Sequence, residues 1–300
     1  MTKKSFKSGF VALIGAPNAG KSTILNNILG QKISITSRRP QTTRHRILGI
    51  KTTEASQVVY VDTPGMHLGG KRALNKYLNK TADTSLMGVD VIVWVKDDMQ
   101  WDAIDISILE KLKNEGAPVV LAINKIDKVA DKESLLPFIQ KISLEHDFQS
   151  IIPISALTGK QLGEFEQLLL TLLPEGELMF PEDQVTDSSE RFMATEIIRE
   201  KLIRRLGQEI PHSLSISIDQ YKVEEKITRI HAVIWVERDG QKNIVIGDKG
   251  VGLKEVGTQA RLDIEKMLES KVYLNLWVKV KKNWSDNERE LISLGYRGIE

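Results

Sequence analysis

Gly15-Ala16-Pro17-Asn18-Ala19-Gly20-Lys21-Ser22 is the stretch that decides the fold, because it joins the apolar run Phe10–Ile14 to a helical stretch at about 21–30. Glycine lets the backbone N–H groups turn inward, and the start of a helix adds about half a positive charge. Such a loop holds phosphate groups, with Lys21 on the β/γ oxygens and the Ser22 hydroxyl on Mg²⁺. We therefore expect residues 15–23, ending at Thr23, to bind a nucleotide; the alternative is a plain glycine turn.

Short apolar runs and helical stretches alternate from Phe10 to about Pro174. The expected strands are Phe10–Ile14, Arg46–Lys51, Val58–Val61, Val89–Val95, Val119–Ile123 and Ile151–Ile154. The expected helices lie at about 21–30, 73–86, 103–115, 132–146 and 161–173. Apolar strands with crossover helices indicate an α/β fold, in which helices flank a mostly parallel sheet. The second run is polar and partly alternating, which predicts an antiparallel edge strand.

Asp62-Thr63-Pro64-Gly65 directly follows the run Val58–Val61. An acid at the carboxyl end of a strand, beside the phosphate loop, can hold Mg²⁺ through a water molecule. The Gly65 amide can meet a γ-phosphate without side-chain obstruction. Taken alone, these four residues also describe an ordinary turn.

Asn124-Lys125-Ile126-Asp127 follows the next-to-last strand of this region. The Asp127 carboxylate can accept two parallel hydrogen bonds from guanine N1–H and the 2-amino group, a donor pair that adenine lacks. We expect Lys125 to stack on the base and Asn124 to tie this loop to the phosphate loop. Ser155-Ala156-Leu157 could offer a backbone N–H to guanine O6, although a helix N-cap explains that stretch equally well.

These four stretches, in this order, resemble the translation-factor-like class of P-loop GTPases over about residues 8–174. The resemblance implies GTP and GDP binding with Mg²⁺, slow hydrolysis and two nucleotide-dependent loops. It assigns catalysis to Lys21, Thr43, Asp62 and Gly65, and the metal to Ser22, Thr43 and, through water, Asp62. Thr42 stands beside Thr43, and the sequence leaves both open. The basic loop Arg38–Arg46 is either a solvated surface or a patch that faces phosphate.

Met66 occupies the position at which many GTPases of this class carry the glutamine that orients the attacking water. Its thioether cannot perform that task. His67 is one substitute, although a lone loop histidine is more often solvated. The potassium-activated branch of the class offers another, in which an asparagine at the position of Asn18 helps to bind K⁺ where an arginine finger would otherwise act.

Residues 174–189 carry two prolines, five acids and little periodicity, which is typical of a linker. We therefore expect a GTP-binding domain at 1–175, a linker at 176–189 and a smaller α+β domain at 190–300. Its expected elements are a helix at about 190–206, strands Leu214–Tyr221 and Ile227–Glu237, a turn at Asp239-Gly240, a helix at 251–269 and a strand Tyr273–Lys281. Periodicity leaves Asn243–Ile246 open as a strand or a helical turn.

The stretch Val245–Val256, with Gly247-Asp248-Lys249-Gly250 inside it, resembles the core of a KH domain, here of type II. A G-x-x-G loop before a helix can clamp about four nucleotides of a single strand against an apolar groove. Alone, the four residues are a common turn. We expect RNA contacts from Ile246, Gly247, Asp248, Lys249, Gly250, Lys254, Lys279 and Lys281.

Charge supports this RNA site only locally. Residues 181–300 carry 20 basic and 21 acidic residues, so the domain as a whole does not attract RNA. However, no acid lies between 270 and 284, where Lys279 and Lys281 stand; the alternative is a solvated or edge-protecting lysine face. Of the flanking tryptophans, we expect Trp277 in the core and Trp284 to pack or to stack on a base.

Together, the GTPase-like and KH-like regions resemble the Era family of bacterial small-subunit assembly GTPases over nearly the whole chain. The resemblance implies a monomer that binds single-stranded RNA near the 3′ end of 16S ribosomal RNA, on the 30S subunit, with GTP favouring the RNA-competent state. It also implies a cytoplasmic location with peripheral membrane association. An RNA-modifying GTPase and a membrane-signalling GTPase are the alternatives, but a modification centre with cysteine is missing and the G-x-x-G argues for RNA.

Composition excludes several other classes. The chain has 300 residues and no cysteine, which excludes a disulfide framework, a thiolate metal site and a cysteine nucleophile and suits a reducing cytoplasm. The formal net charge of +2 identifies no partner. The longest apolar runs fall far short of the roughly 18 residues that span a bilayer.

Overall fold

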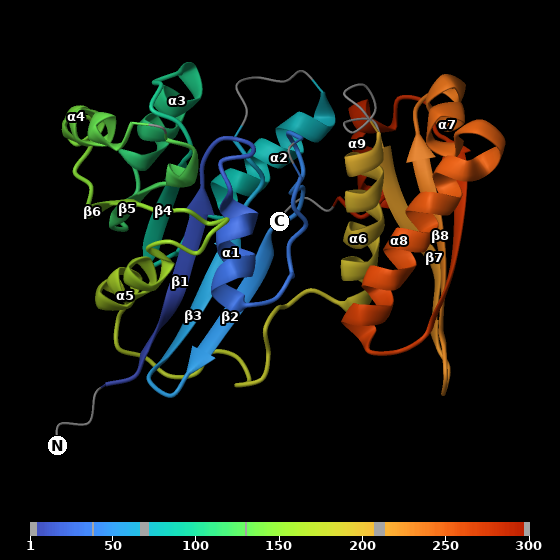
Figure 1. Cartoon of the computed structure of the whole chain (residues 1–300), viewed down its shortest axis with the longest axis horizontal. Helices are drawn as coiled ribbons and strands as arrows, with labels where there is room; N and C mark the ends of the chain where they lie inside the picture. Colours follow the sequence, from blue (N-terminus) through green and yellow to red (C-terminus); the bar gives the residue numbers. More distant parts are fainter. Residues whose placement is uncertain (1–4, 38, 67–71, 130, 207–213, 297–300) are drawn as a thin grey trace. The chain divides into compact units, whose positions relative to one another are not determined.

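The computed structural model describes residues 5–37, 39–66, 72–129, 131–206 and 214–296. The described residues fall into two compact units, one from within 1–34, 43–70 and 78–187, and the other from within 35–42, 71–77 and 188–300. Figure 1 labels their helices and strands. Local sequence patterns predict the elements of each unit, but they do not predict that segments 35–42 and 71–77 group with the second.

The first unit is built on a six-stranded sheet in the order β2-β3-β1-β4-β5-β6. Its strands are β1 (Lys7–Ile14), β2 (Ile47–Thr53), β3 (Ser56–Asp62), β4 (Val91–Lys96), β5 (Val119–Ile123) and β6 (Ser150–Pro153). All neighbouring strands pair in parallel except β2, which is antiparallel to β3 at the edge, as its alternating polarity predicts. Both faces of the central strands are buried, which explains their continuous apolar runs.

Five helices flank this sheet in Figure 1: α1 (Lys21–Leu29), α2 (Ala73–Thr84), α3 (Ala103–Leu112), α4 (Leu135–Ile142) and α5 (Leu162–Leu172). Alternate residues of the central strands, such as Trp94 and Ile123, pack against side chains of α2, α3 and α4. Helix α1 packs against β2, β3 and α5. Helix α4 is shorter than the expected 132–146 stretch and is preceded by a 3₁₀ turn at Lys132–Ser134.

Part of the expected linker at 176–189 packs on the first unit. The Ile50 N–H donates to the Val185 carbonyl at 2.8 Å. The buried Gln57 amide donates to the Phe180 carbonyl and accepts the Phe180 N–H, both at 2.9 Å. These hydrogen bonds join the stretch to the edge of β2 and to a buried side chain. They hold it in place although its sequence has neither helical nor strand periodicity.

The second unit has the αββααβ order of a type II KH domain. Its elements are α6 (Glu190–Arg205), β7 (Leu214–Val223), β8 (Thr228–Val236), α7 (Asp239–Ile246), α8 (Val251–Leu268), β9 (Val272–Val280) and α9 (Glu288–Ser293). The sheet order is β7-β8-β9, with β7 antiparallel and β9 parallel to β8. The expected turn at Asp239-Gly240 is wrong, because both residues begin α7, which also settles Asn243–Ile246 as helix.

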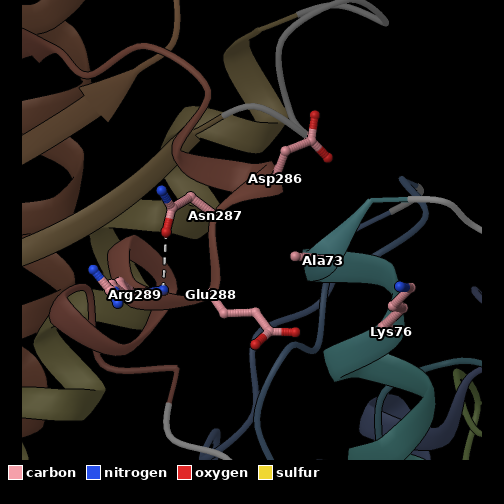
Figure 2. Close-up of a pocket in the computed structure, with 6 residues that line it drawn as sticks. All are labelled: Ala73, Lys76, Asp286, Asn287, Glu288 and Arg289. Atoms are coloured by element: carbon pink, nitrogen blue, oxygen red, sulfur yellow. Dashed lines mark hydrogen bonds between the residues drawn. The ribbon is translucent and has the colours of Figure 1, made fainter.

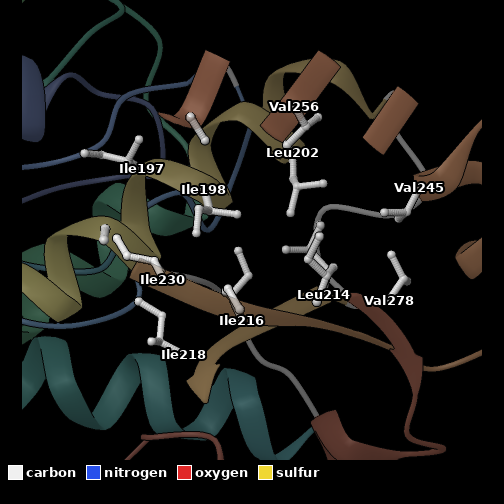
Figure 3. Close-up of a cluster of buried hydrophobic side chains, with 14 of the residues drawn as sticks. Ile197, Ile198, Leu202, Leu214, Ile216, Ile218, Ile230, Val245, Val256 and Val278 are labelled. Atoms are coloured by element: carbon white, nitrogen blue, oxygen red, sulfur yellow. The ribbon is translucent and has the colours of Figure 1, made fainter. Parts of the chain in front are cut away.

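One face of this sheet forms the core of the second unit with α6 and α8 (Figures 1 and 3). Leucine, isoleucine and valine side chains from the three strands meet Ile198 and Leu202 of α6 and Val256 and Ala260 of α8. The residues between them on each strand must point to the opposite face, since side chains alternate along a strand. Only one face of this sheet is therefore occupied by the core.

Of the two tryptophans near β9, Trp277 is not in the core as expected, whereas Trp284 packs, which is one of the two alternatives expected for it. Trp277 is 57% exposed, whereas Trp284 is fully buried and its ring stacks on Tyr296 with centroids 6.2 Å apart. Trp277 alternates with Leu276 and Val278, which face the core, so it points away from it. Trp284 belongs to the 3₁₀ turn Trp284–Asp286, which follows β9.

We predict that Trp284→Ala lowers the free energy of unfolding by about 3–5 kcal/mol, the usual cost of emptying a buried aromatic site. Trp277→Ala should change it by no more than about 0.5 kcal/mol, because the ring is largely in water already. Urea unfolding of the full chain, followed by circular dichroism, measures both. Equal losses in the two variants would contradict these placements.

Candidate functional site

The phosphate-binding stretch lies between β1 and α1, at the carboxyl end of the central part of the sheet. Gly20 has φ of 104°, and a Cβ there would lie 2.1 Å from Asn124 Nδ2. At Gly65 a Cβ would lie 2.6 Å from Pro17 Cα. Both positions therefore require glycine, one by conformation and crowding and the other by the close approach of two loops. The sequence-predicted Gly65 is thereby packed directly against the phosphate loop.

Lys21 begins α1 and is buried beneath this loop. Its ammonium donates to the carbonyls of Gly15 at 3.0 Å and Ala16 at 2.9 Å. Burial lowers the pKa of Lys21 to about 8, although Asp62 and Asp97 act in the opposite direction. A cation held by backbone oxygens at the centre of the loop is placed to bind an anionic ligand there.

Asp62 ends β3 and is fully buried. Its Oδ2 accepts hydrogen bonds from Ser22 Oγ at 2.6 Å and Ser34 Oγ at 2.8 Å, while its Oδ1 has no hydrogen-bond partner. Burial raises the pKa of Asp62, and the interactions with Ser22, Lys21 and Ser34 oppose that rise. A buried carboxylate oxygen left without a partner is costly unless a cation or water completes the site.

Thr43 completes this oxygen cluster. Its Oγ1 lies 2.9 Å from Ser22 Oγ, and since Ser22 donates to Asp62, Thr43 donates to Ser22. The hydroxyls of Ser22 and Thr43 with Asp62 Oδ1 form a set of hard oxygen ligands that suits Mg²⁺. No group of three or more histidine, aspartate or glutamate residues with metal-site geometry occurs in the described parts of the chain. The cluster therefore fits a metal that takes its remaining ligands from phosphate or water.

Thr42, the alternative to Thr43, is placed differently. It belongs to the second unit, where its Oγ1 lies 2.6 Å from Ser37 Oγ and donates to the Arg39 carbonyl at 2.6 Å. Its own carbonyl accepts a hydrogen bond from the buried Arg199 of α6, in the same unit. The Thr42 hydroxyl is thus used within its own loop. Arg38 and His67 lie outside the described residues.

Ser34 and Asn26 contribute to the site although nothing in the sequence singled them out. Asn26 Oδ1 accepts the N–H groups of Ile33 and Ser34, both at 3.0 Å, and its Nδ2 donates to the Ser34 carbonyl at 2.7 Å. These bonds fix Ser34 so that its hydroxyl reaches Asp62. The only local signal is an asparagine inside a helix, which by itself says nothing of a partner eight residues away.

The stretches predicted to bind the base meet through Asn124. Its Nδ2 donates to the Ala19 carbonyl at 2.8 Å, and its Oδ1 accepts the Ala156 N–H at 2.9 Å. The tie between Asn124 and the phosphate loop is therefore present as predicted. Three stretches that are far apart in the sequence converge on one buried amide.

Asp127 is exposed at the open side of this junction. Its Oδ1 accepts a hydrogen bond from the buried Ser155 hydroxyl at 2.5 Å, which orients the carboxylate. Lys125 adopts a left-handed conformation with φ of 63°, and its ammonium lies 2.5 Å from Asp97 Oδ2. Leu157, the last residue of the Ser155–Leu157 stretch, is 74% exposed. An oriented carboxylate beside an open surface can read a base with two adjacent donors.

Met66 is 4% exposed and packs in the apolar core with Ile14, Ala82 and Leu86. It presents no polar group to the site. Asn18 has φ of 65° within the phosphate loop, the conformation that asparagine tolerates best after glycine.

The second candidate site surrounds the G-x-x-G loop between α7 and α8. Gly247, Lys249 and Gly250 all have positive φ, of 72°, 46° and 80°. Val251, which follows the loop, is 63% exposed, and Ile244 before it is 51% exposed. Backbone N–H groups at a helix start, flanked by exposed apolar side chains, form the surface that a sugar-phosphate strand with unstacked bases requires.

Arg205 lies beside this loop and was not among the predicted site residues. A Cβ on Gly252 would lie 2.6 Å from Arg205 Nη1, so the guanidinium packs directly on the glycine backbone. Its Nε donates to Glu255 at 3.2 Å. By contrast, Lys279 lies on β9 with the parity of Trp277, and Lys281 directly follows the strand, with its ammonium over the Trp235 ring on the face of the sheet that α8 does not cover. The structure thus does not bring all the predicted RNA-binding residues together.

Another hollow, of about 490 Å³, is shown in Figure 2 and carries none of this chemistry. It is lined by Ala73 and Lys76 of α2 and by residues 286–289. Asn287 Oδ1 accepts the Arg289 N–H at 3.0 Å and so caps α9. The hollow is lined by two basic and two acidic side chains, so its charge favours neither an anionic nor a cationic ligand.

Comparisons with known proteins agree with this geometry. Residues 10–125 match the family described as 50S ribosome-binding GTPase, and residues 209–285 match the KH domain family. The chain is 56% identical over 288 residues to the GTPase Era of Coxiella burnetii, covering 96% of this chain and 97% of the relative. This chain belongs to the Era family of GTPases.

Two solved structures of Era proteins superpose on nearly the whole chain. One is a point variant of Aquifex aeolicus Era bound to GDP·AlF₄⁻, and the other is Era in complex with MgGDPNP and nucleotides 1506–1542 of 16S ribosomal RNA. For each, the TM-score is 0.94 at 40% identity, over 97% of this chain and 99% of the other. The α/β GTPase fold with a C-terminal KH domain is thereby confirmed.

We predict that Asp127→Asn lowers GTP affinity at least about 100-fold, because it replaces a charged acceptor of two hydrogen bonds with an amide that mismatches the guanine 2-amino group. The same variant should gain affinity for xanthosine triphosphate, whose 2-oxo group accepts a bond from the amide. Titration with fluorescent nucleotides measures both. Unchanged GTP affinity with no gain for the xanthine nucleotide would contradict the role of Asp127.

Proposed function

We propose that this protein is a GTP-hydrolysing molecular switch that binds single-stranded ribosomal RNA, at the 3′ end of 16S ribosomal RNA, through its KH domain and acts in assembly and maturation of the small ribosomal subunit. The observation that carries this proposal is the presence, in one chain, of a nucleotide site with the oriented Asp127 carboxylate and a G-x-x-G loop with the backbone geometry of an RNA clamp. The Era complex with MgGDPNP and 16S ribosomal RNA supports it.

The nucleotide chemistry follows from the first site. We propose that Ser22, Thr43 and, through water, Asp62 hold Mg²⁺, which when bound neutralises charge that develops on the phosphates. The contact of Thr43 with Ser22 supports Thr43 rather than Thr42 in this role. Lys21 binds the β/γ-phosphates, and the Gly65 amide meets the γ-phosphate. With no polar side chain at position 66, hydrolysis proceeds slowly.

The RNA site follows from the second unit. Gly247 and Gly250 let the backbone approach the phosphates, Lys249 and Lys254 are exposed beside them, and Ile246 and Asp248 complete the loop. We add Arg205 to this set, because its guanidinium lies against the start of α8. Glycine on both sides of the loop keeps side chains away from the path that the sugar-phosphate chain would take.

The remaining assignments rest on the family. We propose that the GTP state favours RNA binding, that the protein acts on the 30S subunit as a cytoplasmic monomer, and that residues 1–175, 176–189 and 190–300 serve as GTP-binding domain, linker and RNA-binding domain. Peripheral membrane association is part of the same proposal. Among the described helices, none combines the length and apolar character that crossing a bilayer requires.

We predict that K⁺ stimulates GTP hydrolysis over Na⁺ at saturating Mg²⁺. Asn18 would help to bind K⁺ at the phosphates, where its charge replaces that of an arginine finger. Met66→Ala should leave kcat within about threefold, since Met66 is a core side chain with no polar group. Phosphate release in matched K⁺ and Na⁺ buffers measures both. Equal rates in the two salts exclude the K⁺ role, and a large loss in Met66→Ala excludes a passive methionine.

We predict that Gly247→Asp and Gly250→Asp abolish binding of single-stranded RNA while GTP affinity stays unchanged. Each variant places a carboxylate where phosphates must approach, and the positive φ adds strain. Gly250→Asn is the matched control: asparagine has the same size and tolerates φ near 80°, so it should retain part of the affinity. Lys249→Ala should lower the log–log salt slope by about 0.7 without loss of specificity.

Fluorescence anisotropy with a labelled strand from the 3′ end of 16S ribosomal RNA measures these affinities, and circular dichroism checks the fold. Unaltered RNA affinity in both folded aspartate variants would reject the loop as the RNA site. A parallel loss of GTP affinity would show that the two sites do not act independently.

A further inference from the structure

The face of the β7-β8-β9 sheet that α6 and α8 leave uncovered carries a second set of aromatic and basic side chains. On β8, Ile230, Ala232 and Ile234 enter the core, so Arg229, His231 and Trp235 lie on the other face. The strand register pairs Arg229 with Tyr273, Val233 with Trp277, and Trp235 with Lys279. We call this surface, from Arg229 and Tyr273 at one end to Trp235 and Lys281 at the other, the outer sheet face.

Two aromatic rings of β9 are exposed on the outer sheet face. Tyr273 is 44% exposed and Trp277 is 57% exposed. They are four residues apart on one strand, which separates them by about 13 Å along it. The core does not need these rings, because Val272, Leu274, Leu276 and Val278 supply its contacts from β9. Large rings held in water by a rigid strand can act as stacking platforms.

Cations lie over two rings of the outer sheet face, those of Trp235 and Tyr273. The ammonium of Lys279 is 5.7 Å and that of Lys281 is 5.5 Å from the centre of the Trp235 ring, whose Nε1 donates to Ser217 at 2.9 Å. At the other end, the Arg229 guanidinium is 5.5 Å from the Tyr273 ring. Between them is a groove of about 560 Å³ lined by Asp219, Gln220, His231, Val233, Trp277 and Lys279.

Exposed aromatic rings next to basic side chains favour single-stranded nucleic acid as the partner. Exposed rings accept unpaired bases of any sequence by stacking, and neighbouring cations bind the phosphates between them. Glu224 and Glu290 pair with Arg229 and Lys281 at the ends, and the described groove between them is lined by one lysine, Lys279, and one acid, Asp219. A second copy of the chain would bring like charges together across a two-fold axis, which disfavours self-association through this surface.

The outer sheet face is separate from the G-x-x-G loop but can be reached from it. The loop begins α8, whose residues Val256, Ala260 and Ile264 pack on the opposite face of the sheet. Helix α7, which precedes the loop, packs against the edge strand β9. A strand that leaves the loop along α7 would therefore reach the β9 edge of the sheet, the strand that carries Trp277.

We propose that the outer sheet face, centred on Trp277 and Lys279, is a second binding surface for single-stranded RNA, which extends the strand held by the G-x-x-G loop. Trp277 stacks on a base and Lys279 contacts a phosphate. This inference rests on the proposed RNA-binding function, and it assigns Lys279 to a different stretch of RNA from the one that Lys249 contacts.

The test compares two RNA lengths. The full-length protein is titrated with a labelled strand of about 6 nucleotides, which occupies the loop, and one of about 12 nucleotides that contains the same sequence and continues beyond it. Trp277→Ala should weaken binding of the longer strand about tenfold and leave the shorter one unchanged. Trp277→Phe retains an aromatic face and should stay within about threefold of the wild type. Lys279→Ala should lower the salt slope by about 0.7 for the longer strand only.

Matched controls come from α8, where Leu262 and Lys266 are also exposed. Leu262→Ala and Lys266→Ala remove an apolar group and a charge from that helix, and neither should change binding of either strand. An equal loss for both strands in Trp277→Ala would overturn the inference, because the ring would then serve the loop or the fold. So would unchanged binding of the longer strand.

The failures of the two proposals are distinguishable. If the wild type does not bind the shorter strand, or if Gly250→Asp does not abolish that binding, the proposed loop function fails. If the loop behaves as proposed and Trp277→Ala has no effect on the longer strand, only the outer sheet face is rejected. Sedimentation of the wild type and of Trp277→Ala tests whether a second copy of the chain binds this face instead of RNA. A dimer that the substitution abolishes would assign the face to self-association and overturn the inference.

Discussion

The side-chain amide of Asn124 is the contact on which the arrangement of the nucleotide loops depends. It donates to the Ala19 carbonyl in the phosphate loop and accepts the Ala156 N–H in the last loop, while its own backbone leads into Asp127. Gly20 must lack a side chain for this amide to fit. Because the amide is buried and bonded at both ends, loss of either partner would leave a polar group unsatisfied. The predicted phosphate loop and the predicted base-binding loops are therefore held in one fixed arrangement.

The buried carboxylate of Asp62 sets the second constraint. Burial raises the pKa of this carboxyl group. The hydroxyl groups of Ser22 and Ser34 both donate hydrogen bonds to Oδ2, which stabilises the charged form. Oδ1 has no hydrogen-bond partner. Since Asn26 fixes Ser34 and α1 fixes Ser22, the carboxylate cannot rotate freely to satisfy both oxygens. This arrangement explains why a strand end, a helix start and the loop that leads to Thr43 must all come together at one place.

Much of this site is predictable from the sequence because its parts are short, local and tied to strand ends. The phosphate loop, the Asp62 stretch and the Asn124 stretch each follow an apolar run, and parallel strands bring their carboxyl ends together. The contributions of Ser34 and Arg205 are not predictable in this way, since each acts through a partner distant in the sequence. The start of α7 was also missed. Asp239-Gly240 favours a turn locally, but the Gln241 side chain accepts the N–H groups of Glu237 and Arg238 and so caps a helix.

Trp277 differs from these cases, because the pattern that decides which face it occupies is present in the sequence. From Val272 to Lys281 the chain alternates strictly, with Val272, Leu274, Leu276, Val278 and Val280 on one parity. A strand with one apolar face must then turn Trp277 to the same side as Lys279 and Lys281, whatever the hydrophobicity of the indole ring. The size of the Trp277 ring favours a core position, but the register of β9 decides which face the ring occupies. A shift of the strand by one position would bury the lysines instead. The same alternation that places the core of the second unit therefore places an aromatic ring among cations on its open side.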